Sequence, residues 1–342
     1  QLIDNYGADA LRMTLAAHAA QGRDVKLSEN RVEGYRNFTT KLWNAARFCE
    51  MNGCRVDPEF KPERCKETIN RWIIGKVSQS VSEISSGIEN YKFNEAAGSA
   101  YQFTWGTFCD WYIEFAKPIF YGEDNIAKAE TQATSAWVLE QLMRLLHPFM
   151  PFITEELWHK LGENRSSMLI SAEWPDLGGL SDPAVNTEMD WVIRLITQVR
   201  SVRSEINVSD TDKIPLILKN PEKIAISCVG THSELIKRLA RLEWLEISDA
   251  DVPEGAAQAI LDTTTLVFPL DSIINVDEEK VRLEQELLKL GAEIERLDNK
   301  LANKNFITKA PKEVVELERA KREDYELSRS KMLEAVARLS KT

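Results

Sequence analysis

The C-terminal part of the chain carries the repeat that most restricts its fold. Apolar residues recur there at steps of 4, 3, 4, 3 and 4, at Leu283, Leu287, Leu290, Ile294, Leu297 and Leu301. This spacing is that of a coiled-coil seam, in which the a and d positions pack against a partner helix. After Pro311 a second apolar series follows, at Val314, Leu317, Tyr325, Met332, Ala335 and Leu339. Because the two stretches have similar lengths, we expect an antiparallel helical hairpin over 276–342, with arms on the order of 30 Å at 1.5 Å per residue.

The heptad pattern does not show which helix packs against this seam. An intramolecular hairpin and an intermolecular coiled coil have the same 4-3-4-3 spacing, so a helical scaffold that dimerises through this arm remains an alternative. Between Lys300 and Lys312 the sequence holds four lysines and no carboxylate. A cationic, Asn-rich tip of this kind suits phosphate contacts, although a solvated coiled-coil tip would have the same composition.

A second strong pattern lies in the stretch 29–49, which is typical of a helix with one buried side. Its apolar residues are spaced by three and four, at Val32, Tyr35, Phe38, Leu42, Ala45 and Cys49. Beside them runs a polar face, formed by Asn37, Lys41 and Asn44 with Arg36 and Arg47 flanking it. Amides and cations at this spacing can bond phosphates, sugars and base edges, but a solvated helix face shows the same pattern.

The residues around this helix predict an α-helical bundle. Ser28 is the expected N-cap of the first long helix, and further helical stripes occupy 69–91, 96–115, 126–146 and 153–161. We expect the 96–115 helix to stop near Pro118. Four long amphipathic helices with short polar connections favour a bundle. Its core or its ends should take up Trp105, Trp111, Trp137 and Trp158, to which we assign no chemistry.

A small α/β module is expected after the loop-like segment at 175–183. One helix is striped by Trp191, Leu195, Val199, Val202 and Ile206, with Arg194, Arg200 and Arg203 off that stripe. Residues 213–218 are typical of a strand, which Pro215 would place at a sheet edge. Residues 222–241 are expected to be helical in one or two pieces, and 242–247 and 265–270 alternate like strands.

Composition excludes several classes of protein. No apolar run approaches the roughly 20 residues of a membrane helix, and no secretory leader is recognisable at 1–12. Five irregularly spaced cysteines argue against a disulfide framework and suit a reducing cytosol, and neither they nor the four scattered histidines form a metal-ligand pattern. Phosphate-binding, zinc-protease and serine-hydrolase motifs are absent, so no catalytic centre is predicted.

The net charge of −11 does not exclude a nucleic-acid partner. Residues 277–342 hold 15 basic and 15 acidic side chains, so the remaining residues carry the whole negative excess. Local cationic patches can still bind nucleic acid, because salt screens charges beyond about 10 Å.

Five strings together resemble the valyl-tRNA synthetases of bacterial type, and they span nearly the whole chain. They are YGADALR (6–12), GRDVKLSENRVEGYRNFTTKLWNAARF (22–48), FTWGTFCDWYIEFAKP (103–118), LHPFMPFITEELW (146–158) and KLANKNFITKAPKEVVELERAK (300–321). The isoleucyl and leucyl relatives share the helical-bundle pattern and are the alternative families. The tip pattern between Asn303 and Val315 resembles that of the valyl enzymes.

This resemblance implies a mainly α fold divided into four parts. Residues 1–24 would be the end of a stem-contact region, 25–175 an anticodon-binding bundle, 176–275 the small α/β module and 276–342 a coiled-coil tRNA-binding arm. It also implies a class I ligase that joins valine to its tRNA with ATP and Mg²⁺, on catalytic and editing domains upstream of Gln1. We therefore expect this chain to hold no cofactor, to bind valine-accepting tRNA, and to be inactive alone. We further expect a cytoplasmic monomer that binds no membrane.

The resemblance also gives roles to individual residues. On the anticodon side it points to Arg36, Asn37, Lys41, Asn44 and Arg47, with Trp43, Phe48 or Tyr35 as stacking platforms. For Tyr35 a buried role in the core is favoured over stacking on a base. Arg200 and Arg203 are candidate clamps for the tRNA backbone. At the tip of the arm the expected contacts are Lys300, Asn303, Lys304, Asn305, Phe306 and Lys309.

Overall fold

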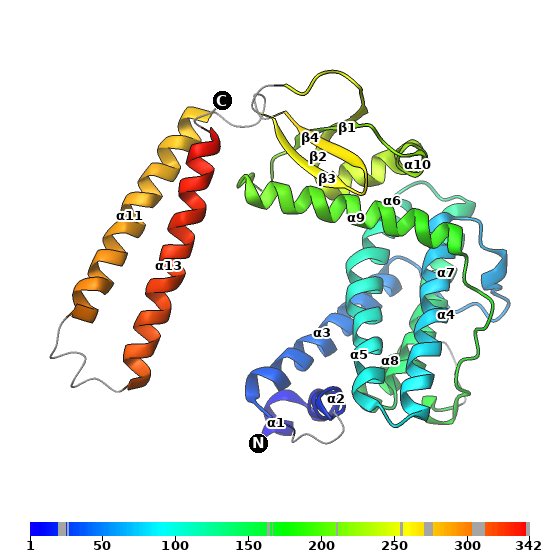
Figure 1. Cartoon of the computed structure of the whole chain (residues 1–342). Helices are drawn as coiled ribbons and strands as arrows, with labels where there is room; N and C mark the ends of the chain where they lie inside the picture. The colour runs from blue at the N-terminus through cyan, green and yellow to red at the C-terminus, as the bar shows by residue number, and fades with distance from the viewer. Residues whose placement is uncertain are drawn as a thin grey trace. The chain divides into compact units, whose positions relative to one another are not determined.

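The structure of the chain is a computed structural model with two compact units. It describes residues 1–19, 25, 27–162, 165, 167–209, 211–253, 256–269, 276–302 and 312–339. Unit 1 comprises Gln1–Ile193 and unit 2 comprises Arg194–Thr342, so the boundary falls inside helix α9, Pro183–Glu205. Each unit is described by itself (Figure 1). The four-part division expected from the sequence is finer, and this two-part division does not test it.

Unit 1 is a helical bundle, as the sequence predicts. Its elements are α1 (Leu2–Tyr6), α2 (Ala8–His18), α3 (Glu29–Met51), α4 (Thr68–Glu89), α5 (Phe93–Gln102), a π-helical segment (Phe103–Tyr112), α6 (Ile113–Phe120), α7 (Ile126–Leu146) and α8 (Pro151–Leu161). Short 3₁₀ turns at Pro62–Arg64 and Leu169–Ser171 complete it. The long helices bury their apolar stripes against one another, and Trp72 and Tyr112 are among the largest fully buried side chains.

Some details of the bundle agree with the sequence-based expectation and others differ. The helix ends at Phe120, close to Pro118 as predicted, although Pro118 itself lies inside α6 rather than after it. Tyr91 is 73% exposed and follows α4 in a left-handed conformation, rather than belonging to its buried stripe. Ser28 is the N-cap of α3, but its side chain makes no capping bond. The four tryptophans expected in the core or at its ends agree with that expectation, since Trp158 is buried and Trp105, Trp111 and Trp137 are half-buried.

A hydrogen-bonded network crosses the core of unit 1. The Tyr112 hydroxyl, at the end of the π-helical segment, donates to Asn70 Oδ1 at 2.9 Å. The Asn70 amide in turn donates to Glu130 Oε1 at 3.0 Å and Thr131 Oγ1 at 3.1 Å on α7. Glu130 also accepts the backbone N–H groups of Lys66 and Glu67 ahead of α4. Because Asn70 and Tyr112 are fully buried, these bonds replace the water that both groups lose on folding.

A second polar cluster ties α2 to the corner between α7 and α8. The carboxylate of Asp9 accepts the N–H groups of Phe152 at 3.2 Å and Ile153 at 2.7 Å, and so caps the first turn of α8 from another helix. On the other side of the corner, Arg12 donates to the carbonyl of Pro148 at 2.9 Å and that of Phe149 at 3.3 Å. The partial positive charge at a helix N-terminus stabilises a carboxylate, and the partial negative charge at a C-terminus stabilises a guanidinium. The strings 6–12 and 146–158 therefore meet in space.

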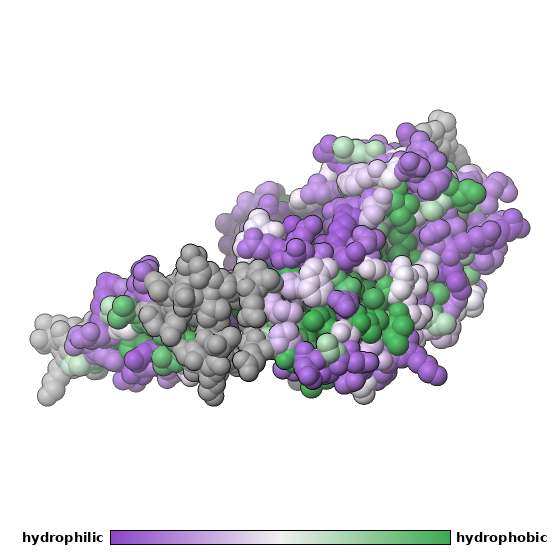
Figure 2. Space-filling view, turned by 90° about the horizontal axis from the view of Figure 1, so that it is seen from above, coloured by the Kyte–Doolittle hydropathy of each residue, from purple (hydrophilic) through white to green (hydrophobic). Residues whose placement is uncertain are grey.

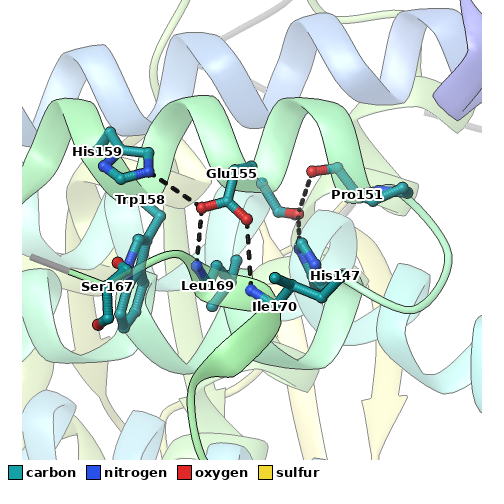
Figure 3. Close-up of polar contacts among 9 residues, drawn as sticks. His147, Pro151, Glu155, Trp158, His159, Ser167, Leu169 and Ile170 are labelled. Atoms are coloured by element: carbon teal, nitrogen blue, oxygen red, sulfur yellow. Dashed lines mark hydrogen bonds and ion pairs between the residues drawn. The ribbon is translucent and has the colours of Figure 1, made fainter.

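The far side of α8 is held by Glu155. Its carboxylate accepts the N–H of Leu169 at 2.8 Å and lies 3.2 Å from His159 Nε2, as Figure 3 shows. Next to it, His147 Nδ1 and Thr154 Oγ1 are 2.8 Å apart. Burial lowers the pKa of His147, and the charge of Glu155 opposes that shift, so the neutral ring is favoured at neutral pH. Glu155 is therefore a structural anchor of α8.

Unit 2 begins with a four-stranded mixed sheet. Its strands are β1 (Ile214–Lys219), β2 (Leu242–Ile247), β3 (Ala257–Leu261) and β4 (Thr264–Phe268), in the spatial order β2-β1-β4-β3. The strands β1 and β2 are parallel and joined by α10 (Lys223–Ala240), whereas β4 is antiparallel to β1 and β3 (Figure 1). The helix α10 is kinked at His232, which agrees with the expectation of one or two pieces.

Two expectations about this module were wrong. Pro215 does not mark an edge strand, because β1 lies between β2 and β4; the ladder to β2 shifts register between Ile214 and Leu216, where proline can provide no N–H. Arg203 does not lie off the buried stripe of α9 but is only 6% exposed. The sequence analysis also missed strand β3, whose alanines and glutamine give little strand signal.

The C-terminal hairpin has the predicted antiparallel arms, α11 (Val276–Ala302) and α13 (Lys312–Leu339) (Figure 1). Ile294, Leu297 and Val315 are buried between them. The second arm turns a different set of residues toward the first arm than the sequence predicts. Leu317, expected in the seam, is 57% exposed, whereas Glu318 and Arg322 form ion pairs with the first arm. The side chains of Leu283, Val314, Ala335 and Leu339 lie outside the described residues.

Figure 2 shows one face on which hydrophilic residues predominate and hydrophobic residues come to the surface in separate patches. Within the described residues, no helix is long and apolar enough to cross a membrane.

We predict that Asp9→Ala destabilises unit 1 by about 1–3 kcal/mol, because it leaves the first turn of α8 without its cap. Urea unfolding followed by tryptophan fluorescence would measure the loss, since eight of the nine tryptophans lie in unit 1. The exposed Glu123→Ala serves as the control and should change the unfolding midpoint little. Equal midpoints for the two variants would contradict a stabilising role of the Asp9 cap.

Candidate nucleic-acid interface

The polar face of α3 lies on the surface of unit 1. Arg36, Asn37, Asn44 and Arg47 are exposed, and Lys41 between them is half-buried. On the opposite side of the helix, Val32, Phe38, Leu42, Ala45 and Cys49 are buried, so the helix cannot turn this face inward. Arg36 lies 3.2 Å from Glu33 one turn earlier. The structure thus brings the five residues predicted for this face onto one exposed side.

Lys41 differs from its neighbours because it is already engaged. Its Nζ lies 2.6 Å from Asp110 Oδ1 and 4.6 Å from the centre of the Trp105 ring. The ring of Trp105 is stacked on Tyr101, with centroids 5.8 Å apart and an interplanar angle of 22°. Cations placed over an indole face are attracted by its quadrupole, so Lys41 is held by an ion pair and a cation–π contact together.

Both partners of Lys41 come from the π-helical segment. Trp105 and Asp110 are five residues apart, and the i→i+5 bonding of a π-helix brings such residues to the same side. The segment lies between α5 and α6 and contacts α3, α4 and α6. A π-helical turn is rare and often accompanies a functional site.

Further aromatic rings border the polar face. Tyr35 is half-buried, with its ring edge-on to Tyr101 at 5.8 Å. Burial raises the pKa of Tyr35 and of Tyr101, so both phenols keep their protons at neutral pH. Toward the end of α3, Lys160 lies 4.7 Å from the centre of the Trp43 ring, and Phe48 lies 6.5 Å from the exposed Tyr121. Rings of this kind beside amides and cations are what single-stranded RNA binding requires.

Two cysteines of unit 1 are protonated thiols. Burial raises the pKa of Cys109 to about 12 and that of Cys65 to about 11, so both remain thiols at neutral pH. Across the described parts of the chain, no three His, Cys, Asp or Glu side chains are placed to hold a metal ion.

The two arginines predicted as clamps for the tRNA backbone are used within unit 2. Arg200 donates through Nε and Nη2 to the carbonyl of Leu239, at 3.2 and 3.0 Å, near the end of α10. Arg203 is buried and donates to three carbonyls, those of Arg241, Ser209 and Asp212. These bonds give both side chains a structural role within unit 2. The contact of the two arginines with the tRNA backbone stays a prediction.

At the tip of the arm the structure describes only Lys300 among the predicted contacts. Its Nζ lies 2.9 Å from Glu318 Oε1, and this pair lowers the pKa of Glu318. The remaining predicted tip residues, Asn303, Lys304, Asn305, Phe306 and Lys309, lie outside the described residues.

Comparison with known protein families identifies two parts of the chain. Residues 70–218 match the family described as the anticodon-binding domain of tRNA ligase, and residues 275–340 match the valyl tRNA synthetase tRNA binding arm. The first match includes the π-helical segment, and α3 lies ahead of it.

Individual relatives extend the similarity to most of the chain. A valine–tRNA ligase of Brucella suis is 48% identical over 322 residues, covering 93% of this chain and 35% of that protein. A valine–tRNA ligase of Rhizobium meliloti is 47% identical over 343 residues, covering 99% and 36%. The chain belongs to the valyl-tRNA synthetase family. It spans little more than a third of the length of these relatives, and it corresponds to their C-terminal part.

A solved structure was also found, that of an Agrobacterium radiobacter leucyl-tRNA synthetase in a ternary complex. It is 17% identical, covers 79% of this chain and 30% of that one, and has a TM-score of 0.42. At that level the similarity adds nothing to the assignment to the valyl-tRNA synthetase family.

Sequence reasoning missed the partners of Lys41. The Trp105 and Asp110 side chains share a face only because the segment is π-helical, and in an α-helix they would be about 140° apart at 3.6 residues per turn. The composition of FTWGTFCDWY does not predict a π-helix. The only signal in the sequence is the five-residue spacing between an aromatic residue and a carboxylate, Trp105 and Asp110.

Proposed function

We propose that this chain is the tRNA-recognition part of a valine–tRNA ligase. In this proposal the polar face of α3 binds the anticodon side of a valine-accepting tRNA, and the α11–α13 hairpin contacts the tRNA elsewhere. The whole protein would join valine to that tRNA with ATP and Mg²⁺. This chain, which corresponds to the C-terminal part of its relatives, would hold neither cofactor and would not aminoacylate alone.

The observation that carries the proposal is the make-up of the polar face. Exposed Asn37 and Asn44 provide donors and acceptors for base edges, Arg36, Lys41 and Arg47 provide positive charge, and half-buried rings border them. Similarity to an anticodon-binding domain in the same unit, and to a tRNA binding arm in the hairpin, supports the same partner.

The hairpin also bears on the alternatives. The arm match favours the valyl type over the isoleucyl or leucyl types. The seam of α11 is covered by α13 of the same chain, which supports a monomer over a scaffold that dimerises through the arm. A cytoplasmic location and upstream catalytic and editing domains belong to this proposal as well.

The test of the proposal is binding of this chain to valine-accepting tRNA and to an unrelated tRNA at two salt concentrations. We expect tighter binding of the valine-accepting tRNA and weaker binding of both at high salt, because phosphate contacts release counterions. Binding to neither tRNA at low salt would overturn the proposal.

Substitutions on the polar face should affect discrimination more than total affinity. We expect Asn44→Ala and Lys41→Ala each to cost about 1–3 kcal/mol with valine-accepting tRNA if they contact bases, and less with an unrelated tRNA. Equilibrium binding to both tRNAs measures the difference. Glu123→Ala is the control, and equal losses on the two tRNAs would argue against base readout by these residues.

The tip of the arm should act through charge. We expect Lys304→Ala combined with Lys309→Ala to weaken binding of all tRNAs and to lower the slope of log affinity against log salt by up to about one for each lost phosphate contact. The slope is measured over a salt series. A slope equal to that of the unaltered chain would remove the tip from the interface.

A further inference from the structure

The central cation of the polar face is already neutralised in the free chain. Lys41 is bound to Asp110 at 2.6 Å, and the side chains of the two residues are 35% and 43% exposed. Around it, within the described residues, Asn37, Asn44 and Arg47 make no ion pair or hydrogen bond through their side chains. A phosphate or base that used Lys41 would therefore compete with the carboxylate of Asp110.

The position of that carboxylate is fixed by the backbone. Asp110 reaches Lys41 from the same side as Trp105 because the segment Phe103–Tyr112 is π-helical. The end of the segment is anchored by the buried bond from Tyr112 to Asn70. Asp110 thus stands beside the face on a rigid support rather than on a mobile loop.

An ion pair at this exposure is weak enough to be exchanged. Half-exposed pairs contribute little net free energy, since water and salt screen them. Contacts of Lys41 with a polyanion can replace the pair, whereas an RNA that makes few other contacts with the face would gain little from Lys41 while the pair persists.

We propose that Asp110 is a specificity-determining residue of the tRNA-binding face, because it occupies Lys41 until an RNA that also satisfies the neighbouring amides displaces it. The proposal rests on the function proposed above and adds to it a carboxylate that competes with RNA for Lys41. Asp110 lowers the affinity for every RNA, and it lowers the affinity most for those that bind through phosphates alone.

The experiment compares Asp110→Asn with the unaltered full chain on valine-accepting and unrelated tRNA over a salt series. We expect the variant to bind both tRNAs about two- to five-fold more tightly. The gain should be larger for the unrelated tRNA, so the ratio of the two affinities falls. The salt slope should steepen by up to about one, because one more cation becomes available to phosphate.

Three further variants separate this role from a structural one. In a Lys41→Ala background, Asp110→Asn should give at most a small gain, since the cation that it frees is absent. Asp110→Glu keeps the charge and should retain the discrimination of the unaltered chain. Glu95→Gln removes a carboxylate from the exposed pair with Lys92 on α5, and it should leave discrimination unchanged. Circular dichroism and thermal melting of each variant confirm that the bundle is folded.

The outcomes distinguish this inference from the function on which it rests. If the unaltered chain binds tRNA selectively and Asp110→Asn changes neither the affinity ratio nor the salt slope, the role of Asp110 is overturned and the proposed function stands. A gain of the same size in the Lys41→Ala background or with Glu95→Gln would also overturn it. If the unaltered chain binds no tRNA, both proposals fail.

Discussion

The buried bond between Tyr112 and Asn70 is the interaction on which the architecture of unit 1 depends most. It joins the π-helical segment to α4, and through Glu130 and Thr131 it reaches α7, so three layers of the bundle share one polar network. Burial raises the pKa of Tyr112 well above its usual value, which keeps the hydroxyl protonated as a donor. A network that is satisfied at every member specifies one arrangement of its helices, because any other would leave a buried polar group unpaired. The geometry of the surface that carries Trp105 and Asp110 follows from that arrangement.

The helices and the heptad hairpin could be predicted because their signals are local and periodic. The buried side of α3 and the bounds of α7 agree with their patterns, and the first arm buries Ile294 and Leu297 as its spacing requires. The spacing of apolar residues predicts Leu317 in the second seam. In the structure the charged residues Glu318 and Arg322 contact the first arm instead. Pattern reasoning assumes apolar contacts, and it fails where ion pairs hold two helices together.

The contacts that position the candidate interface could not be read from the sequence. Asp9 caps a helix more than 140 residues away, and Lys41 meets residues nearly 70 positions later, so only the folded chain brings them together. The residue types of the polar face were visible, since amides and cations at steps of four and three stand out on an amphipathic helix. Which of them is engaged and which is open depends on the π-helical register, for which a single sequence gives no periodic signal.

The ion pairs across the hairpin fix the alignment of its two arms. Lys300 pairs with Glu318 and Asp298 with Arg322, at separations that fit one alignment of the two arms. A shift of one heptad would leave the apolar spacing intact, yet it would take Glu318 away from Lys300, so the polar positions fix the register as single polar residues do in coiled coils. At 1.5 Å per residue the 27 residues of α11 span about 40 Å. Adding seven residues to each arm would lengthen that span by about 10 Å while preserving the seam. The reach of the arm can therefore be altered in steps without redesigning the helices that form it.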